Sequence, residues 1–167
     1  DVSYDAGTPG AQNSRFAINA GPTYTEFRHG PVVPKAGEAT TVSVVAADPD
    51  GVASLTLYYA VNSGAFATVA MTHAGGGRYT AAVPGQSAGS VVQFYAQGVD
   101  ALGAISTYPS DGAASRALYI VEDGAAAVGQ LHNVRVIMTP VDRDFLYLNT
   151  NRMSNDYLGA TVIYDES

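Results

Sequence analysis

The stretch TVSVVAADPDGVASLTLYYAV, Thr41 to Val61, decides the fold class of this chain. Both halves alternate apolar and polar residues with a period of two, which places every second side chain of a β-strand on one face. The sequence therefore predicts two half-buried strands joined by a short turn. The predicted inner faces carry Val42, Val44 and Ala46 in the first strand, and Leu55, Leu57, Tyr59 and Val61 in the second.

The link between these strands is DPDG, residues 48–51. Pro fixes φ and Gly permits a positive φ, so the segment is typical of a turn. Its two aspartates, Asp48 and Asp50, together with Asp100, could also offer carboxylate oxygens to Ca²⁺. The segment lacks the Asp-x-Asp-x-Asp run and the following acid of a calcium loop. We therefore predict that the segment is a turn and does not bind metal. If calcium does bind here, these three aspartates are its candidate ligands.

The same alternation continues in short runs between residues 23 and 123, separated by glycine-bearing links. Short strands at such spacing predict an antiparallel β-sandwich, here of about seven or eight strands. The chain is therefore expected to be all-β over this range. The further predicted strands are FATVAMT (66–72), RYTAAVP (78–84), VVQFYAQGVD (91–100) and ALYIVED (117–123).

Three tyrosines, Tyr58, Tyr95 and Tyr119, stand out of phase with the predicted core residues of their strands, and Gln93 and Gln97 indicate a solvated face. The chain has 11 tyrosines and no tryptophan. Exposed rings on a sheet could stack on sugars, which makes these tyrosines candidate ligands for a glycan. The alternative, which we favour, is that the rings cover the second face of the sandwich or pack on a neighbouring domain.

Composition limits the function further. The 167 residues suit one domain with flanking segments. The hydrophobic content of 47% indicates a globular chain. No apolar run in the sequence is long enough to span a membrane. A net charge of −7 with eight scattered basic residues argues against nucleic-acid binding. The absence of cysteine excludes disulfides and thiolate zinc sites.

No catalytic arrangement is present in the sequence. His29, His73 and His132 are far apart and form no His-x-x-x-His pair, and there is no Gly-x-Ser-x-Gly motif or phosphate-binding loop. We therefore predict no catalytic residue and no cofactor.

The pattern changes after residue 130. The run LHNVRVIMT (131–139) alternates like a strand, and Thr139, Pro140 and Asp142 then suit the N-cap, N1 and N3 positions of a helix. ATVIYD (160–165) resumes as a strand, so the tail is predicted to be β-α-β. Such a unit cannot bury both faces of its own sheet, so it must dock on the sandwich, swap onto another molecule or fray. The predicted apolar stripe of the helix is Val141, Phe145 and Leu148.

Residues 31–109 resemble the immunoglobulin-like or fibronectin-III-like modules of large secreted bacterial proteins, in the pieces GPVVPKAGEATTVSVVAADPDGVASLTLYYAVNSGAFATVAM, GRYTAAVP and GSVVQFYAQGVDALGAISTYP. The tail, residues 131–167, is similar to the start of the spore-coat-protein-H-like (CotH) family, which has an atypical kinase fold. The head, DAGTPGAQNS (5–14), resembles the closing turn of a lamin-tail domain. The kinase-like family's catalytic residues lie beyond its opening strands, so none is carried over.

These resemblances imply four segments: residues 1–22 as a linker or the end of a preceding domain, 23–123 as an immunoglobulin-like sandwich, 124–130 as a spacer, and 131–167 as the truncated start of a CotH-like domain. We expect a secreted or cell-surface bacterial protein, monomeric unless the tail swaps.

The predicted function is a non-catalytic spacer and interaction module that positions a kinase-like neighbour in the same polypeptide. The alternative is a module that binds carbohydrate or a cell-surface protein through exposed tyrosines. We expect no nucleic acid, membrane or cofactor as a partner.

Overall fold

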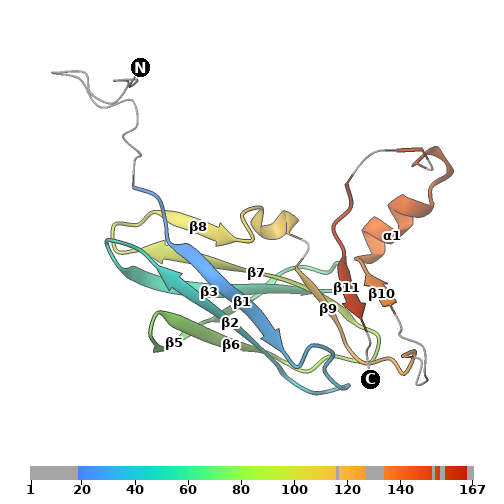
Figure 1. The fold of residues 1–167 in the computed structure, drawn as a ribbon, viewed down its shortest axis with the longest axis horizontal. Coiled ribbons are helices and arrows are strands. Elements are labelled where there is room, and N and C mark those ends of the chain that lie inside the picture. Colours follow the sequence, from blue (N-terminus) through green and yellow to red (C-terminus); the bar gives the residue numbers. More distant parts are fainter. Residues whose placement is uncertain (1–18, 116, 127–133, 152, 155–156, 165–167) are drawn as a thin grey trace.

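The computed structural model describes residues 19–115, 117–126, 134–151, 153–154 and 157–164. These residues form a pair of antiparallel sheets packed face to face, with a helix and a two-stranded sheet at one end (Figure 1). The lamin-tail-like stretch 5–14 and His132 fall outside the described residues. The predicted all-β sandwich with a C-terminal β-α-β extension is confirmed.

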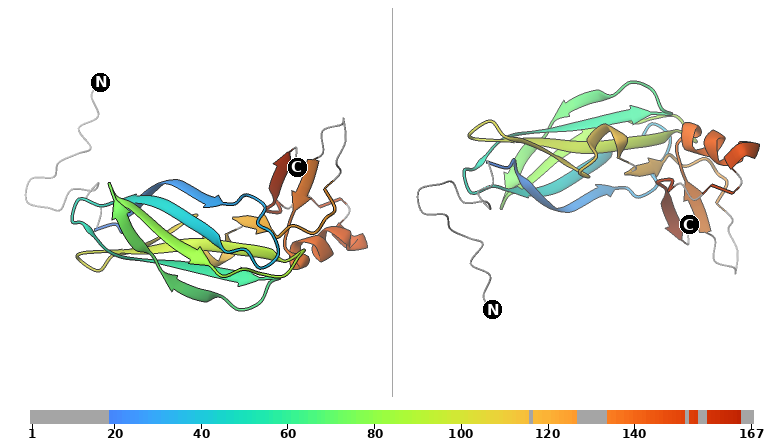
Figure 2. Two further views of the ribbon diagram at one scale, coloured as in Figure 1. Left: turned by 90° about the horizontal axis from the view of Figure 1, so that it is seen from below. Right: turned by 90° about the horizontal axis from the view of Figure 1, so that it is seen from above.

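The two large sheets form the two layers seen in Figure 2. The first has the order β1-β2-β6-β5, and the second has the order β4-β3-β7-β8 with β9 also paired to β7. The structure has nine strands among the described residues of 23–123, whereas the sequence predicts about seven or eight. Their bounds are β1 Thr23–Gly30, β2 Thr40–Ala47, β3 Val52–Val61, β4 Ala67–Ala70, β5 Thr72–Gly75, β6 Arg78–Val83, β7 Val91–Asp100, β8 Ile105–Tyr108 and β9 Leu118–Ile120.

One added strand arises because the predicted run 66–72 is divided at Met71, and β1 and β8 match none of the runs named above. β4 pairs with β3 in the second sheet, whereas β5 pairs with β6 in the first. Met71 is buried where the chain changes sheets, and its N–H donates to the Leu55 carbonyl at 2.9 Å. The alternation of Val69 and Met71 in the sequence gives no sign of this change of sheet.

The core lies between the two sheets and uses the predicted inner faces. Val42, Val44 and Leu57 have no exposed area, and Phe94 of β7 belongs to the same core and contacts the Phe27 and His29 rings of β1. The predicted DPDG turn is also confirmed: the Asp50 N–H donates to Asp48 Oδ1 at 2.8 Å, and Gly51 takes φ +91°. The alternation on both sides of the turn therefore correctly predicts which side chains of the two strands face the core.

The outer face of β7 is covered at Gln93, contrary to the solvated face that this residue predicts, whereas Gln97 is half-exposed. After β8 the chain forms a short 3₁₀ turn, Gly112–Ala114, which lies over this face. The Gln93 side chain is buried and donates to the carbonyls of Ala113 and Ser115. This glutamine thus fixes the covering loop to the strand, because its amide satisfies carbonyls of the loop.

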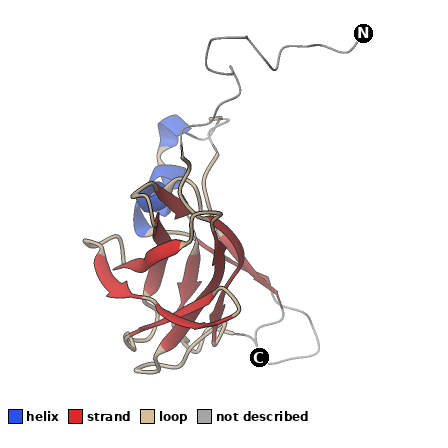
Figure 3. Cartoon of the chain, turned by 90° about the vertical axis from the view of Figure 1, so that its left-hand side faces the viewer, coloured by secondary structure: helices blue, strands red, loops and turns tan. Residues whose placement is uncertain are grey.

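The tail docks on the sandwich. It consists of β10 Val134–Ile137, α1 Pro140–Tyr147, a 3₁₀ turn Asn149–Asn151 and β11 Thr161–Tyr164, and the antiparallel pair β10 and β11 is called the tail sheet below. Ile137 and Ile163 are buried and pack with Ile120 of β9, with Val33 and Val91 at the margin. Burying each isoleucine contributes about 1.5–3 kcal/mol. Figure 3 shows the helical segments gathered at one side of the strands.

The predicted helix start is confirmed, whereas only Phe145 of the predicted apolar stripe is partly buried. The Asp142 N–H donates to Thr139 Oγ1 at 3.2 Å, and Pro140 occupies the first helical turn. Val141 and Leu148 are 64% and 53% exposed, and the buried residue of the helix is Asp142. The capping hydrogen bonds are local and readable from sequence, whereas the buried face depends on what the helix packs against.

Within the described residues, no helix has both the length and the apolar character needed to cross a membrane.

Candidate functional site

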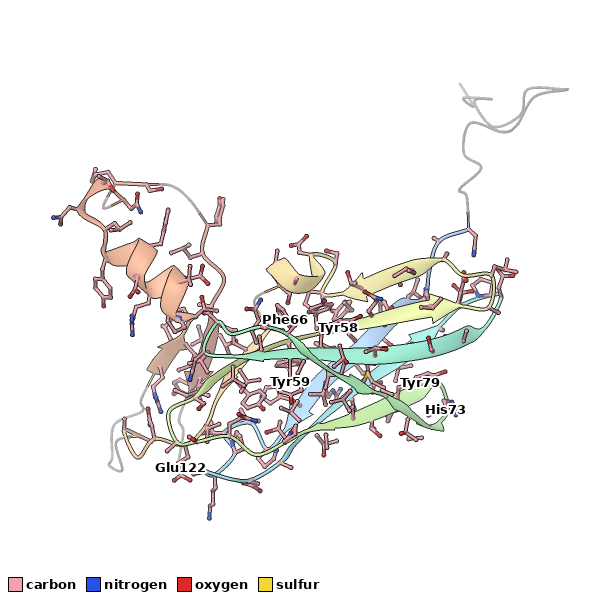
Figure 4. The ribbon with its side chains drawn as sticks, turned by 180° about the vertical axis from the view of Figure 1, so that it is seen from behind. Tyr58, Tyr59, Phe66, His73, Tyr79 and Glu122 are labelled. Carbon is pink, nitrogen blue, oxygen red and sulfur yellow. The ribbon has the colours of Figure 1, made fainter. Side chains whose placement is uncertain are left out.

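An aromatic cluster lies on the outer face of the second sheet. Tyr58 of β3 and Tyr95 of β7 are directly opposite in the register, and their rings stack with centroids 4.7 Å apart and planes 6° apart. Phe66 meets the Tyr95 ring edge-on at 5.3 Å. Figure 4 shows Phe66 beside Tyr58 on this side of the molecule. The structure thus brings together two of the three predicted tyrosines, and adds Phe66, which the sequence pattern does not indicate.

This cluster is packed and does not form an open platform. Tyr95 is only 7% exposed, because Tyr58, Phe66 and the turn at Gly112 surround its ring. A Cβ on Gly112 would lie 3.6 Å from the Tyr95 ring, so the loop passes close to it. Burial, and then the neighbouring Tyr58, raise the pKa of Tyr95. Tyr95 is therefore not exposed, in agreement with the packing alternative, and Tyr58 remains partly accessible.

The predicted exposure of the third tyrosine, Tyr119, is wrong. β9 pairs with β7 so that Tyr119 stands opposite Val92, which turns its ring into the main core, where it is 1% exposed. Its ring stacks on His29 at 5.2 Å, and burial raises its pKa. Burial has the opposite effect on the histidine and lowers the pKa of His29, because it disfavours the charged imidazolium. The short run around Tyr119 has apolar residues in both phases, so the sequence alone could not assign its inner face.

The three candidate calcium ligands do lie together. Asp48, Asp50 and Asp100 each place a carboxylate oxygen within 4.8 Å of the others, at the end of the sandwich opposite the tail. Among the described residues this is the one group of side chains with the makeup of a metal site. Asp48 already caps its turn through the Asp50 N–H.

Asp100 is 1% exposed and serves the turn that follows β7. Its Oδ1 accepts the N–H groups of Leu102 and Ala104 at 2.9 and 2.8 Å, and its Oδ2 accepts the Asn19 amide. Burial alone would raise the pKa of Asp100, but the hydrogen bonds from Ala104, Asn19 and Leu102 hold it below its ordinary value. Each of its oxygens therefore has a structural partner, which supports the turn interpretation.

The tail presents a second surface that the sequence analysis did not single out. The two strands of the tail sheet alternate, so that Ile137 and Ile163 face the sandwich while the opposite face stays open. Cross-strand pairs join Val134 to Tyr164 and Val136 to Val162. The period of two in both strands is the signal from which this face could have been found. The side chains of this open face, Val134, Val136, Val162 and Tyr164, are 56–62% exposed.

The tail sheet is fixed in orientation by an ion pair as well as by apolar contacts. Arg135 donates to both carboxylate oxygens of Asp123, at 2.7 and 3.1 Å, in the forked geometry that guanidinium and carboxylate groups favour. The Ala125 N–H and then Arg135 lower the pKa of Asp123. Thr161 Oγ1 donates to the Leu118 carbonyl at 3.0 Å, so β11 is tied to β9.

Comparison with known proteins gives little more. No family model matches the chain, and no curated protein matches it. One similar solved structure is the crystal structure of a Br derivative of BhCBM56, at 20% identity and a TM-score of 0.36, over 45% of this chain and 77% of that chain. This likeness is too low to bear on function, so the site must be judged from its own geometry.

Replacing Asp48 and Asp50 together by Asn tests the turn interpretation. We expect millimolar CaCl₂ to leave the melting temperature of both the native chain and the double variant unchanged relative to chelator, because the carboxylates serve the turn. Thermal unfolding followed by circular dichroism measures this. A calcium-induced rise in melting temperature that the double variant loses would contradict it.

Replacing Tyr58 by Ala tests whether the aromatic cluster is packing or a glycan site. We expect a loss of about 1–3 kcal/mol in the free energy of unfolding, because the variant removes a stacked ring and part of its buried area. Denaturant unfolding measures the loss, with the fully exposed Tyr157→Ala as the matched control. Polysaccharide retention in affinity electrophoresis that only the folded Tyr58→Ala variant loses would instead establish a glycan site.

Proposed function

We propose that this chain is a non-catalytic extracellular module that spaces and orients a neighbouring domain, which packs on the open face of the tail sheet. The observation that carries the proposal is the two-sided character of this sheet. One face is anchored by Ile137 and Ile163, and the other exposes four large apolar side chains in a continuous cross-strand patch. Contiguous exposed apolar surface of this kind is typical of an interaction site.

The arrangement of the module supports a spacing role. β1 begins at one end of the sandwich and the tail docks at the other, so the two ends of the described chain are far apart (Figure 1). The sandwich between them is stiff because its strands are hydrogen-bonded and its core is closely packed. The forked Arg135–Asp123 pair and the isoleucine contacts would hold a domain built on the tail at a set angle.

The resemblance of residues 131–167 to the start of the CotH-like family supplies the proposed neighbour, a kinase-like domain. The matching domain division belongs to the same proposal: 1–22, 23–123, 124–130 and 131–167. The lamin-tail-like head would place another domain before the sandwich. The glycan-binding alternative is left with Tyr58 alone among the three candidate tyrosines as an accessible ring, so we prefer the spacer.

A charge placed on the open face tests the proposal. We expect Val162→Asp to change the free energy of unfolding of this chain by less than about 0.5 kcal/mol, because the side chain is exposed. In the polypeptide extended by the residues that its gene encodes after Ser167, the same substitution should cost more than about 2 kcal/mol, since it would bury a charge at the domain contact.

The matched control is Val32→Asp, a valine on the sandwich that is 61% exposed against 62% for Val162. It should be equally neutral in the short and the extended polypeptide. Equal effects of both substitutions in the extended polypeptide would reject the proposal, as would a gene that encodes no folded domain after Ser167.

A further inference from the structure

A pocket of about 630 Å³ opens beside the tail sheet, between helix α1 and the end of the sandwich. Val91 and Ile120 line it from the sandwich, and Leu146 and Tyr147 line it from the helix. The rest of its apolar wall comes from β10 and the residue that follows it. Its volume falls within the range of ligand-binding pockets and is ample for one or two large apolar side chains.

The charged residues that line this pocket are both cationic. Arg135 and Arg143 belong to the lining, and no acidic residue among those described does. Each guanidinium has an acidic partner just outside the lining, Asp123 for Arg135 and Asp144 for Arg143, so an acidic occupant would have to compete with these partners. An occupant with carboxylates beside an apolar anchor would complement both its shape and its charge.

The two arginines have different freedom to meet such an occupant. Arg135 is held by the forked contact with Asp123, and its side chain is 18% exposed. Arg143 forms an ion pair with the adjacent Asp144 at 2.8 Å, and both of these side chains are more than half exposed. Exposed pairs of this kind contribute little stability, so Arg143 can exchange its partner for an incoming carboxylate at small cost.

The pocket is continuous with the open face of the tail sheet. Val136 lines the pocket and also belongs to that face, where it pairs with Val162. An open pocket beside an exposed apolar face is common in protein interfaces, in which one anchor side chain occupies the pocket and its neighbours lie across the adjoining surface. A polypeptide therefore fits this surface better than a compact small molecule does.

We infer that this pocket receives a polypeptide segment with a large apolar anchor flanked by acidic residues, whose carboxylates pair with Arg143 at the rim. The inference rests on the proposed function and specifies the chemistry by which the neighbour is recognised. The apolar anchor would bury against Ile120, Val91 and Leu146.

Peptide titration of the 167-residue chain, followed by NMR of its methyl groups, tests the inference. The first probe is a heptapeptide with Leu-Leu-Phe between two pairs of aspartates. The second carries lysines in place of the aspartates, and the third carries serines in place of the apolar residues. We expect the first alone to shift the methyl signals of Val91, Ile120 and Leu146, with an affinity at least about tenfold above the others.

Arg143→Glu should weaken binding of the acidic peptide by about tenfold or more, because it turns an attraction into a repulsion. Arg28→Glu, the same charge change at an exposed site on β1, is the matched control and should have little effect.

Three results would overturn the inference: no shift of the pocket signals with any peptide, equal binding of the lysine-flanked peptide, or equal loss in both arginine variants. These failures are separate from failure of the proposed function. A domain could still cover the open face, as the Val162→Asp comparison would show, without using this pocket.

Discussion

The burial of β7 on both faces is the constraint on which the rest of the structure depends. Its inner face supplies Val92 and Phe94 to the main core, and its outer face supplies Gln93 and Tyr95 to the packing beneath the turn at Gly112. β7 also pairs with three strands, β3, β8 and β9. A strand covered on both faces fixes the register of its neighbours. A slip by one residue would move the side chains of the inner face to the outer face and the reverse, and neither set would fit its new surroundings.

The position of the tail follows from that register. β9 pairs with the start of β7, so Tyr119 enters the core while Ile120 is left on the outer side, next to Val91. Ile120 then becomes the contact for Ile137 and Ile163 of the tail sheet. The apolar face left open on the tail sheet, and the pocket beside it, are therefore consequences of how the sandwich ends. The proposed contact with a neighbouring domain uses this end of the sandwich.

Much of this structure was predictable from local patterns, and the failures have a common cause. Val42, Val44 and Leu57 followed from a period of two, the turn at DPDG followed from its Pro and Gly, and the cap at Thr139 followed from a side chain that bonds within a few residues. The burial of Tyr119, Tyr95 and Gln93 did not follow, because each depends on a segment that is distant or irregular in sequence. Asp100 was grouped with Asp48 and Asp50 from the sequence, and the pairing of β3 with β7 is what brings it to them.

The central claim, that the tail sheet is anchored by one face and open on the other, can be measured directly because the chain has no cysteine. Val162→Cys and Ile163→Cys each introduce a single thiol, on adjacent residues of opposite faces. The account predicts that Cys at 162 reacts with a thiol reagent nearly as fast as in denaturant, and that Cys at 163 reacts about a hundredfold more slowly. Equal reaction rates for the two thiols in the folded chain would contradict it.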